Sequence, residues 1–178
     1  MLEQLDAVIE AALQSMIREL RTSAWYGRER ELVSLFVLGH LMRLCGMHEV
    51  LHTPTQIGIE VAVPQLVGRG GQRKKPDVCK DIVIWPQPSM TCWGRHGDER
   101  CYPLAVLEWK SLNRHDRGTV LTQKRHEHTT DLHWLTVMSG STSPFVGYAV
   151  LVDQQASPTR MAVARACQGE VAEGWFVA

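Results

Sequence analysis

The sequence lacks any long hydrophobic run. No apolar stretch approaches the ~20 residues that a membrane helix needs. Residues 1–6 have neither the basic nor the apolar region of a signal peptide. The five cysteines are odd in number and lack paired Cys-x-x-Cys spacing, which argues against a zinc knuckle or a disulfide framework. We therefore expect a reduced, cytoplasmic protein without a membrane partner.

The sequence also lacks an excess of either charge, because 19 basic residues balance 19 acidic ones. Proteins that bind long DNA without sequence preference usually carry a basic excess. Basic side chains nevertheless gather in one region, at Arg69, Arg73, Lys74, Lys75 and Lys80. This cluster either guides a phosphate chain or is simply a solvated loop.

Length and composition indicate one globular domain spanning residues 1–178. Hydrophobic residues make up 44% of the chain and charged residues 21%, which excludes a disordered protein. Residues 3–21 have the apolar spacing of an amphipathic helix. A second helix is predicted over 28–44, where apolar residues surround most of the circumference and indicate packing on several sides. A third helix is predicted over 120–138.

Alternating or continuously apolar segments predict strands over residues 57–63, 78–85, 104–110 and 145–152. Residues 161–165 and 171–177 predict a terminal hairpin around Gly169. A long loop, 86–103, separates two of the strands, and loops of this length are often functional. The order of elements predicts an α/β fold with helices on both sides of a mixed sheet.

Charged residues interrupt two of these strands where burial should be greatest. Asp81 opens the apolar run Ile82-Val83-Ile84, and Glu108 and Lys110 leave the same face of the strand over 104–110. Buried charges need a partner or a metal. Carboxylates are the ligands that Mg²⁺ prefers, and a lysine beside them can stabilise charge that develops during phosphodiester hydrolysis. Alternatively, Glu108 and Lys110 merely pair with each other on an edge strand.

The segments Lys80-Asp81-Ile82-Val83-Ile84 and Ala105-Val106-Leu107-Glu108-Trp109-Lys110 together resemble the PD-(D/E)xK nuclease superfamily. That resemblance implies a three-layer, restriction-endonuclease-like α-β-β-β-α-β core over about 28–152, with an added N-terminal helix and C-terminal β-hairpin. It implies Mg²⁺, for which Mn²⁺ substitutes, bound by Asp81, Glu108 and the main-chain carbonyl of Trp109. Lys110 would assist the attacking water.

The position of the aspartate ligand has an alternative. Pro76-Asp77 is the literal Pro-Asp pair, whereas Asp81 directly opens the apolar strand. Asp77 and Asp81 are four residues apart, so they could share a face in an extended chain. We favour Asp81 as the ligand and keep Asp77 as the alternative.

Further acidic residues are candidates for the same site. Glu29-Arg30-Glu31-Leu32-Val33 resembles the Glu-Arg-x-x-Val opening of Holliday-junction resolvases, which points to Glu29 as a metal ligand with Glu31 as its neighbour. An acidic first turn is also what the helix dipole favours on its own. Glu60 either lines the site or faces solvent.

Candidate contacts to nucleic acid lie on both sides of the predicted site. They are Arg73, Lys74 and Lys75 in the basic loop, and Gln123 and Lys124 on the following helix, where many members of the superfamily carry a Gln or Lys. Gln123 and Lys124 could equally be surface residues. Trp85, Trp93 and Trp109 could stack on bases, although large aromatic residues more often serve packing.

These observations predict a Mg²⁺-dependent endonuclease acting on nucleic acid, and we expect DNA. One alternative is a catalytically silent nuclease fold that binds nucleic acid or a partner protein, which the neutral net charge favours. Another is a nuclease that cuts only within an oligomer, such as a homodimer held by the N-terminal helix. The polar outer face of that helix argues against such a contact.

Overall fold

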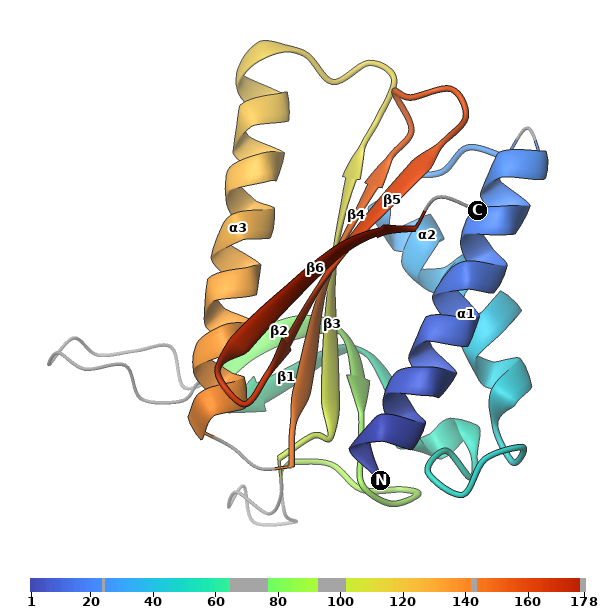
Figure 1. The fold of residues 1–178 in the computed structure, drawn as a ribbon, viewed down its shortest axis with the longest axis vertical. Helices are drawn as coiled ribbons and strands as arrows, with labels where there is room; N and C mark the ends of the chain where they lie inside the picture. The colour runs from blue at the N-terminus through green and yellow to red at the C-terminus, as the bar shows by residue number, and fades with distance from the viewer. Residues whose placement is uncertain (24, 65–76, 93–101, 142–143, 177–178) are drawn as a thin grey trace, which may run out of the picture.

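The fold is built on one six-stranded sheet (Figure 1). The computed structural model describes residues 1–23, 25–64, 77–92, 102–141 and 144–176. Within these residues the strands lie in chain order across the sheet, and only the pair β3–β4 is parallel. Their bounds are β1 (Ile57–Pro64), β2 (Asp77–Ile84), β3 (Ala105–Leu112), β4 (Val146–Asp153), β5 (Arg160–Cys167) and β6 (Glu170–Phe176).

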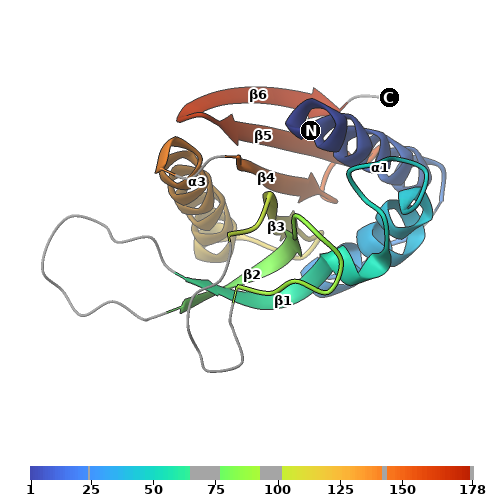
Figure 2. The same cartoon turned by 90° about the horizontal axis from the view of Figure 1, so that it is seen from below.

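Helix α1 (Leu2–Thr22) covers one face of the sheet together with the segment that follows it (Figure 2). Its buried positions recur at the spacing predicted from the sequence, and burying this stripe, rather than helix propensity alone, stabilises such a helix. The buried residues are Leu5, Val8, Ile9, Ala12, Leu13, Met16, Ile17 and Leu20. The prediction for this helix is confirmed, and its apolar stripe is satisfied within the chain.

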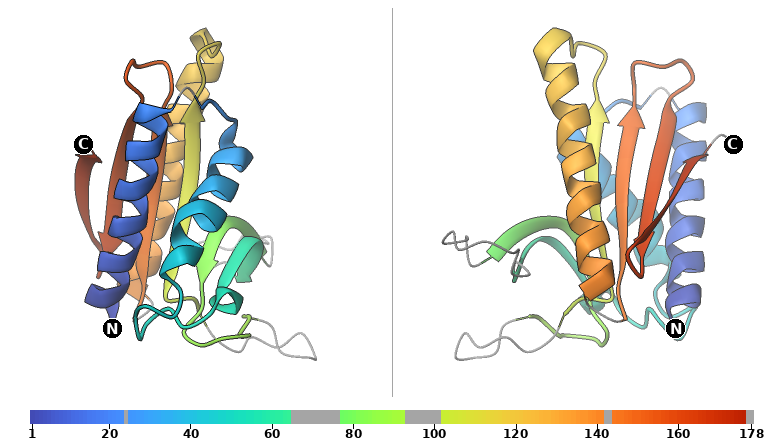
Figure 3. Two further views of the ribbon diagram at one scale, coloured as in Figure 1. Left: turned by 90° about the vertical axis from the view of Figure 1, so that its right-hand side faces the viewer. Right: turned by 60° about the vertical axis from the view of Figure 1, so that its left-hand side comes forward.

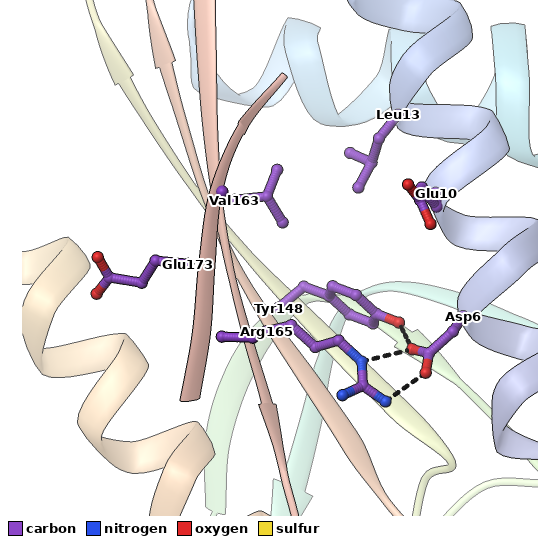
Figure 4. Close-up of a pocket in the computed structure, with 9 residues that line it drawn as sticks. Asp6, Glu10, Leu13, Tyr148, Val163, Arg165 and Glu173 are labelled. Carbon is purple, nitrogen blue, oxygen red and sulfur yellow. Dashed lines mark hydrogen bonds and ion pairs between the residues drawn. The ribbon is translucent and has the colours of Figure 1, made fainter. Parts of the chain in front are cut away.

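Asp6 connects α1 to strands β4 and β5 of the sheet (Figure 4). Its carboxylate accepts hydrogen bonds from the Tyr148 hydroxyl and from both Nε and Nη2 of Arg165. These three residues line a cavity between α1 and β4–β6 whose other lining residues include Leu13 and Val163. The contact fixes how the first helix lies on the sheet.

The second predicted helix exists, but it is not one regular α-helix. It comprises α2 (Glu29–Ser34), a π-helix over Leu35–Leu41 and a 3₁₀ turn over Met42–Leu44. The prediction of packing on several sides was wrong, because Leu38 is 60% exposed. Burial follows a single face with a spacing of four, formed by Leu32, Val33, Phe36, Val37, His40 and Leu41.

Helix α3 (Gly118–Ser141) crosses the opposite face and connects the parallel strands β3 and β4 (Figure 2). Two hydrophobic clusters result, one on each face of the sheet. Trp109 and Phe36 belong to the cluster under α1 and α2, with their ring centroids 5.2 Å apart. Leu135 and Met138 of α3 belong to the other. Helices therefore lie on both faces of a mixed sheet, as predicted.

The β1–β2 pair swings away from the rest of the sheet (Figure 3). Only Ile82–Ile84 pair with Ala105–Leu107, whereas β1 and β2 pair along nearly their whole length. Glu60 in β1 has a positive φ of 51° at the same level, an unusual conformation for a residue with a side chain. A split consequently opens between β2 and β3 on the N-terminal side of Ile82.

The remaining predicted elements are confirmed with small shifts of their ends. Strands 57–63, 78–85, 104–110 and 145–152 and helix 120–138 correspond to β1, β2, β3, β4 and α3. The terminal hairpin is β5–β6, which turns through Gly169 at a φ of 80°. In the part of the chain that the structure describes, no helix is both long and apolar enough to cross a bilayer.

Candidate functional site

Asp81 lies where the pairing of β2 with β3 stops. Its Oδ2 accepts a hydrogen bond of 2.7 Å from the main-chain amide of Trp109. If β2 and β3 stayed paired, a main-chain carbonyl of β2 would accept a hydrogen bond from β3 at this level. The Asp81 carboxylate accepts that bond instead. This contact fixes the Asp81 side chain against β3, within the split.

Glu108 is the most buried acidic residue of the site. Its side chain is 6% exposed and forms an ion pair with Lys80 of β2, which is itself 5% exposed. The Lys80 ammonium also lies 3.8 Å from the ring centroid of Trp134 on α3. Burial raises the pKa of Glu108 to about 7, although the neighbouring Lys80 acts to lower it. Its buried surroundings therefore disfavour the ionised form of the Glu108 carboxyl group.

Lys110 lies among carboxylates at the C-terminal part of β3. Its Nζ donates a hydrogen bond of 2.8 Å to the carbonyl of Trp109 and lies 3.6 Å from Glu29 Oε1 and 3.4 Å from Asp131 Oδ2. Burial lowers the pKa of Lys110, but the surrounding carboxylates, led by Glu29 and Asp131, outweigh it and raise that pKa above its ordinary value. Lys110 is therefore a charged, restrained donor.

Glu29 begins α2 and faces the same region. It lines a cavity together with Asp81, Glu60 and Ile59. Burial raises the pKa of Glu29, Lys110 lowers it in part, and Asp81 adds to the rise. Glu60 also lines this cavity, but its carboxylate lies 2.9 Å from Nε of Arg30. The structure thus brings Glu29, Asp81 and Lys110 to one place.

Glu31 was considered as a neighbour of Glu29 in the site, but it serves the helix instead. Its Oε2 accepts a hydrogen bond of 2.6 Å from the main-chain amide of Arg28, which caps the start of α2. The side chain is exposed. Glu31 therefore has a local structural role.

The two candidates for nucleic-acid contact on α3 are also engaged elsewhere. Lys124 Nζ donates to the carbonyl of Ser111 at 2.9 Å and to Asp116 at 2.7 Å. Gln123 donates to Glu127 along the exposed face of the helix. Lys124 thus holds the start of α3 against the end of β3, and its ammonium is satisfied within the chain.

Several predictions fall outside what the structure describes. Arg73, Lys74 and Lys75 lie outside the described residues, as do Arg69 and Trp93. Asp77 is the first residue of β2, paired with Pro64, but its side chain is not among those described. The choice between Asp77 and Asp81 accordingly stays a prediction.

The aromatic residues next to the site serve packing. Trp109 has no exposed surface and Trp85 is 2% exposed. The Trp109 carbonyl, which the resemblance makes a metal ligand, accepts the hydrogen bond from Lys110. Neither ring is available to a base.

Two residues at the site escaped the sequence analysis. Lys80 was grouped with the exposed basic loop, which is wrong, because it is buried against Glu108 and Trp134. Asp131 of α3 contacts Lys110, and its Oδ2 is buried without a hydrogen-bond partner. The available signal was helical spacing, since Lys124, Asp131 and Trp134 are seven and three residues apart and so share one face.

The site as a whole combines carboxylates of Glu29, Asp81, Glu108 and Asp131 with two lysines. Oxygen donors of this type suit a hard divalent cation. Among the described residues, however, no three His, Cys, Asp or Glu side chains converge closely enough to hold a metal ion. Glu108 faces Lys80 and Asp81 faces the Trp109 amide, which accounts for that result.

Comparisons with protein-family models, with curated protein sequences and with solved structures find no match to this chain.

Proposed function

We propose that this protein is a metal-dependent endonuclease of the PD-(D/E)xK type that hydrolyses phosphodiester bonds in nucleic acid, with DNA as the expected substrate. The observation that carries the proposal is the gathering of Asp81, Glu29 and Lys110 where β2 parts from β3. Glu108 lies two residues before Lys110 on the same strand. An acid-rich split with one restrained lysine suits charge stabilisation at a phosphate.

The connection of the elements supports a restriction-endonuclease-like core. From Glu29 to Asp153 the chain forms a helix, three antiparallel strands, a crossover helix and a strand parallel to the third. This is the α-β-β-β-α-β order that the resemblance implies. The helix α1 and the hairpin β5–β6 extend this core at one side.

The acidic side chains suit Mg²⁺ in donor type. Asp81 and Glu29 are half-buried and share one cavity, and the Asp81 carboxylate adds to the rise that burial causes in the pKa of Glu29. Asp81, Glu108 and Glu29 would hold the ion, with Glu108 released from Lys80. When bound, Mg²⁺ neutralises phosphate charge and lowers the pKa of a water.

The residues of the chain itself have distinct roles in this proposal. Glu29 and Asp131 restrain the Lys110 ammonium from two elements, so that it is held with little freedom beside the split. Lys110 donates to the oxygen that gains negative charge. The Trp109 amide restrains Asp81, and the buried indole of Trp109 fixes the strand behind it.

The alternative is a catalytically silent nuclease fold that binds nucleic acid or a partner protein. One observation favours it, namely the buried ion pair between Lys80 and Glu108. A lysine in this position supplies a fixed positive charge to the glutamate, which then needs no metal ion to be neutralised. The two proposals differ in whether a divalent ion displaces Lys80 from Glu108.

A substrate screen tests the proposal. The purified chain is incubated with supercoiled, linear, branched and single-stranded DNA, and with RNA, in Mg²⁺ or Mn²⁺. We expect cleavage of at least one substrate, loss of cleavage with EDTA, and loss in Asp81→Asn. Glu10→Gln, which changes an exposed carboxylate of α1 at a different cavity, serves as the matched control and should cut normally.

Equal cleavage by Asp81→Asn and the unmodified chain would overturn the site assignment. Failure of the folded protein to cut any of these substrates with either ion, combined with binding to one of them, would support the silent alternative.

A further inference from the structure

Two exposed aromatic residues lie directly before α2. Trp25 is 36% exposed and Tyr26 is 40% exposed. They are followed by Arg28 and then by Glu29 of the site. Large apolar rings left in solvent beside a functional site are informative when their position is fixed.

The backbone beneath these rings is fixed by one buried side chain. Gln154, which is 3% exposed, accepts a hydrogen bond of 3.1 Å from the Gly27 amide and donates one of 2.7 Å to the Gly27 carbonyl. A side chain at position 27 would collide with the Trp25 ring, which therefore lies over the glycine. The exposed rings stand on an anchored backbone.

Gln154 and its neighbour Gln155 also hold a second segment, residues 113–116, which follows β3. Gln154 donates to Asn113 Oδ1 at 3.2 Å. Gln155 donates to the carbonyls of Asn113 and Asp116, both at 2.9 Å. The segment before α2 and the segment after β3 are thus tied to one another through residues 154 and 155, at the same end of the sheet (Figure 1).

The surface formed by these segments carries positive charge. The Arg114 guanidinium lies 5.9 Å from the ring centroid of Tyr26, within cation–π range. Arg28 and Arg114 are both exposed, and the nearby Asp116 is neutralised by Lys124. We call the surface of Trp25, Tyr26, Arg28 and Arg114 the aromatic platform.

The aromatic platform adjoins the site. Glu29 directly follows Arg28, and its carboxylate lies 3.6 Å from the Lys110 ammonium. Asn113 lies three residues after Lys110. A chain resting on the platform would therefore enter the split between β2 and β3 from this end.

We infer that the aromatic platform binds a nucleic-acid strand that carries an unpaired base. This inference rests on the proposed function and names the class of substrate. Every base has a π face that can stack on Tyr26 or Trp25, but in a continuous duplex those faces are covered by neighbouring bases. Arg28 and Arg114 would contact the flanking phosphates and so supply local affinity in a chain of zero net charge.

Binding is measured in EDTA, so that no cleavage is required. Fluorescence anisotropy follows labelled oligothymidylate, oligouridylate and a blunt-ended duplex of the same length. The test variant is Trp25→Ala with Tyr26→Ala. The matched control is Arg43→Ala with Met47→Ala, which changes exposed residues beyond the other end of the π-helix.

We expect both single strands to bind more tightly than the duplex, and the double aromatic variant to weaken that binding about tenfold or more. The control variant should bind like the unmodified chain. Arg28→Ala and Arg114→Ala should each reduce the slope of log Kd against log salt concentration by about 0.7, as expected for one lost phosphate contact on a single strand.

Equal binding by the aromatic variant and its control would overturn the inference, as would a preference for the blunt duplex. Absence of binding, with Trp25 and Tyr26 instead needed for a stable homodimer in sedimentation, would assign the surface to a protein contact and also overturn it. If the chain cleaves its substrate and the platform variants cleave it equally well, the platform inference is rejected and the nuclease proposal stands.

If the chain binds single strands through the platform but cleaves no substrate in Mg²⁺ or Mn²⁺, the nuclease proposal is rejected and the platform inference stands.

Discussion

Lys80 and Glu108 form a buried ion pair between β2 and β3, with the Lys80 ammonium beneath the ring of Trp134. Removing two charges from water is costly, and their attraction recovers that cost only in part. The pKa of Glu108, raised to about 7 mainly by burial, shows that burial outweighs the lysine. Ionisation of Glu108 in the folded protein therefore lowers the free energy of unfolding.

The first prediction concerns stability between pH 4.5 and 7. In the unfolded chain Glu108 loses its proton near pH 4.5, whereas in the native state it keeps the proton up to about pH 7. Stability from this group is fully present below pH 4.5 and is lost as pH rises to 7. Glu108→Gln lacks this loss, so its stability relative to the unmodified chain should rise by up to about 3 kcal/mol across that range.

Urea unfolding of both proteins at a series of pH values measures this difference. Comparing the two chains cancels the pH dependence of every group that both chains share. A relative stability of Glu108→Gln that stays flat, or falls as pH rises, would show that Lys80 keeps Glu108 ionised well below pH 7.

The second prediction concerns catalysis by Lys110. Lys110→Ala should lower cleavage by about 10²–10³-fold, by analogy with the loss of one preorganised transition-state donor. Folding should persist, because Lys110 is partly exposed and the carboxylate of its neighbour Glu29 reaches solvent. Initial rates on the best substrate of the screen measure the effect, with Arg125→Ala on the exposed face of α3 as control. Unchanged cleavage in Lys110→Ala would remove Lys110 from the mechanism.

The third prediction concerns the aspartate ligand. Asp81→Asn should abolish Mg²⁺ binding in titration calorimetry while preserving the fold, because an amide oxygen can still accept the hydrogen bond from Trp109. Asp77→Asn should bind Mg²⁺ like the unmodified chain. The reverse pattern would assign the ligand to Asp77.

The fourth prediction concerns the contact between α1 and the sheet (Figure 4). Burial and the neighbouring Asp6 raise the pKa of Tyr148 well above its usual range, so its hydroxyl stays protonated and donates to Asp6. Asp6→Ala leaves that buried hydroxyl unpaired and should cost about 2 kcal/mol. The partner Arg165 is 37% exposed, so solvent limits its share.

Chemical denaturation measures the loss in Asp6→Ala. Glu10→Ala, one helical turn further along α1 at the rim of the same cavity, should change stability by less than about 0.5 kcal/mol. Equal effects of the two substitutions would mean that the hydrogen bonds of Asp6 do not stabilise the helix on the sheet.

Periodicity predicted the elements well because each buries one face. The stripe of α1 and the continuous apolar runs of β3 and β4 leave few alternatives, and β3 and β4 are buried on both faces as such runs require. The π-helix over Leu35–Leu41 could not be read from the same rule. The sequence is apolar around most of this segment, but Leu35 is only partly buried and Leu38 is exposed, so the apolar pattern gave the wrong burial there.

The strands that carry Asp81, Glu108 and Lys110 were predicted from the sequence, whereas the contacts of these side chains were not. The pairs that Lys80 forms with Glu108 and Lys110 forms with Asp131 depend on the folded chain. Lys80 was misassigned because its nearness in sequence to Arg73, Lys74 and Lys75 grouped it with the basic loop. β2 leaves β3 at Ile82, so the long side chain of Lys80 can reach Glu108. Asp131 comes from a helix far along the chain, and only the crossover of α3 brings it to Lys110.

The helix that begins at Glu29 is anchored at its start, ahead of the π-helical segment Leu35–Leu41. The main-chain amide of Arg28 donates to Glu31, and Gln154 holds Gly27 immediately before it. A π turn closes its hydrogen bond over five residues instead of the four of an α turn. This irregular geometry lies after the cap, so the place of Glu29 beside Lys110 depends on the anchored start of the helix and not on the π-helix that follows.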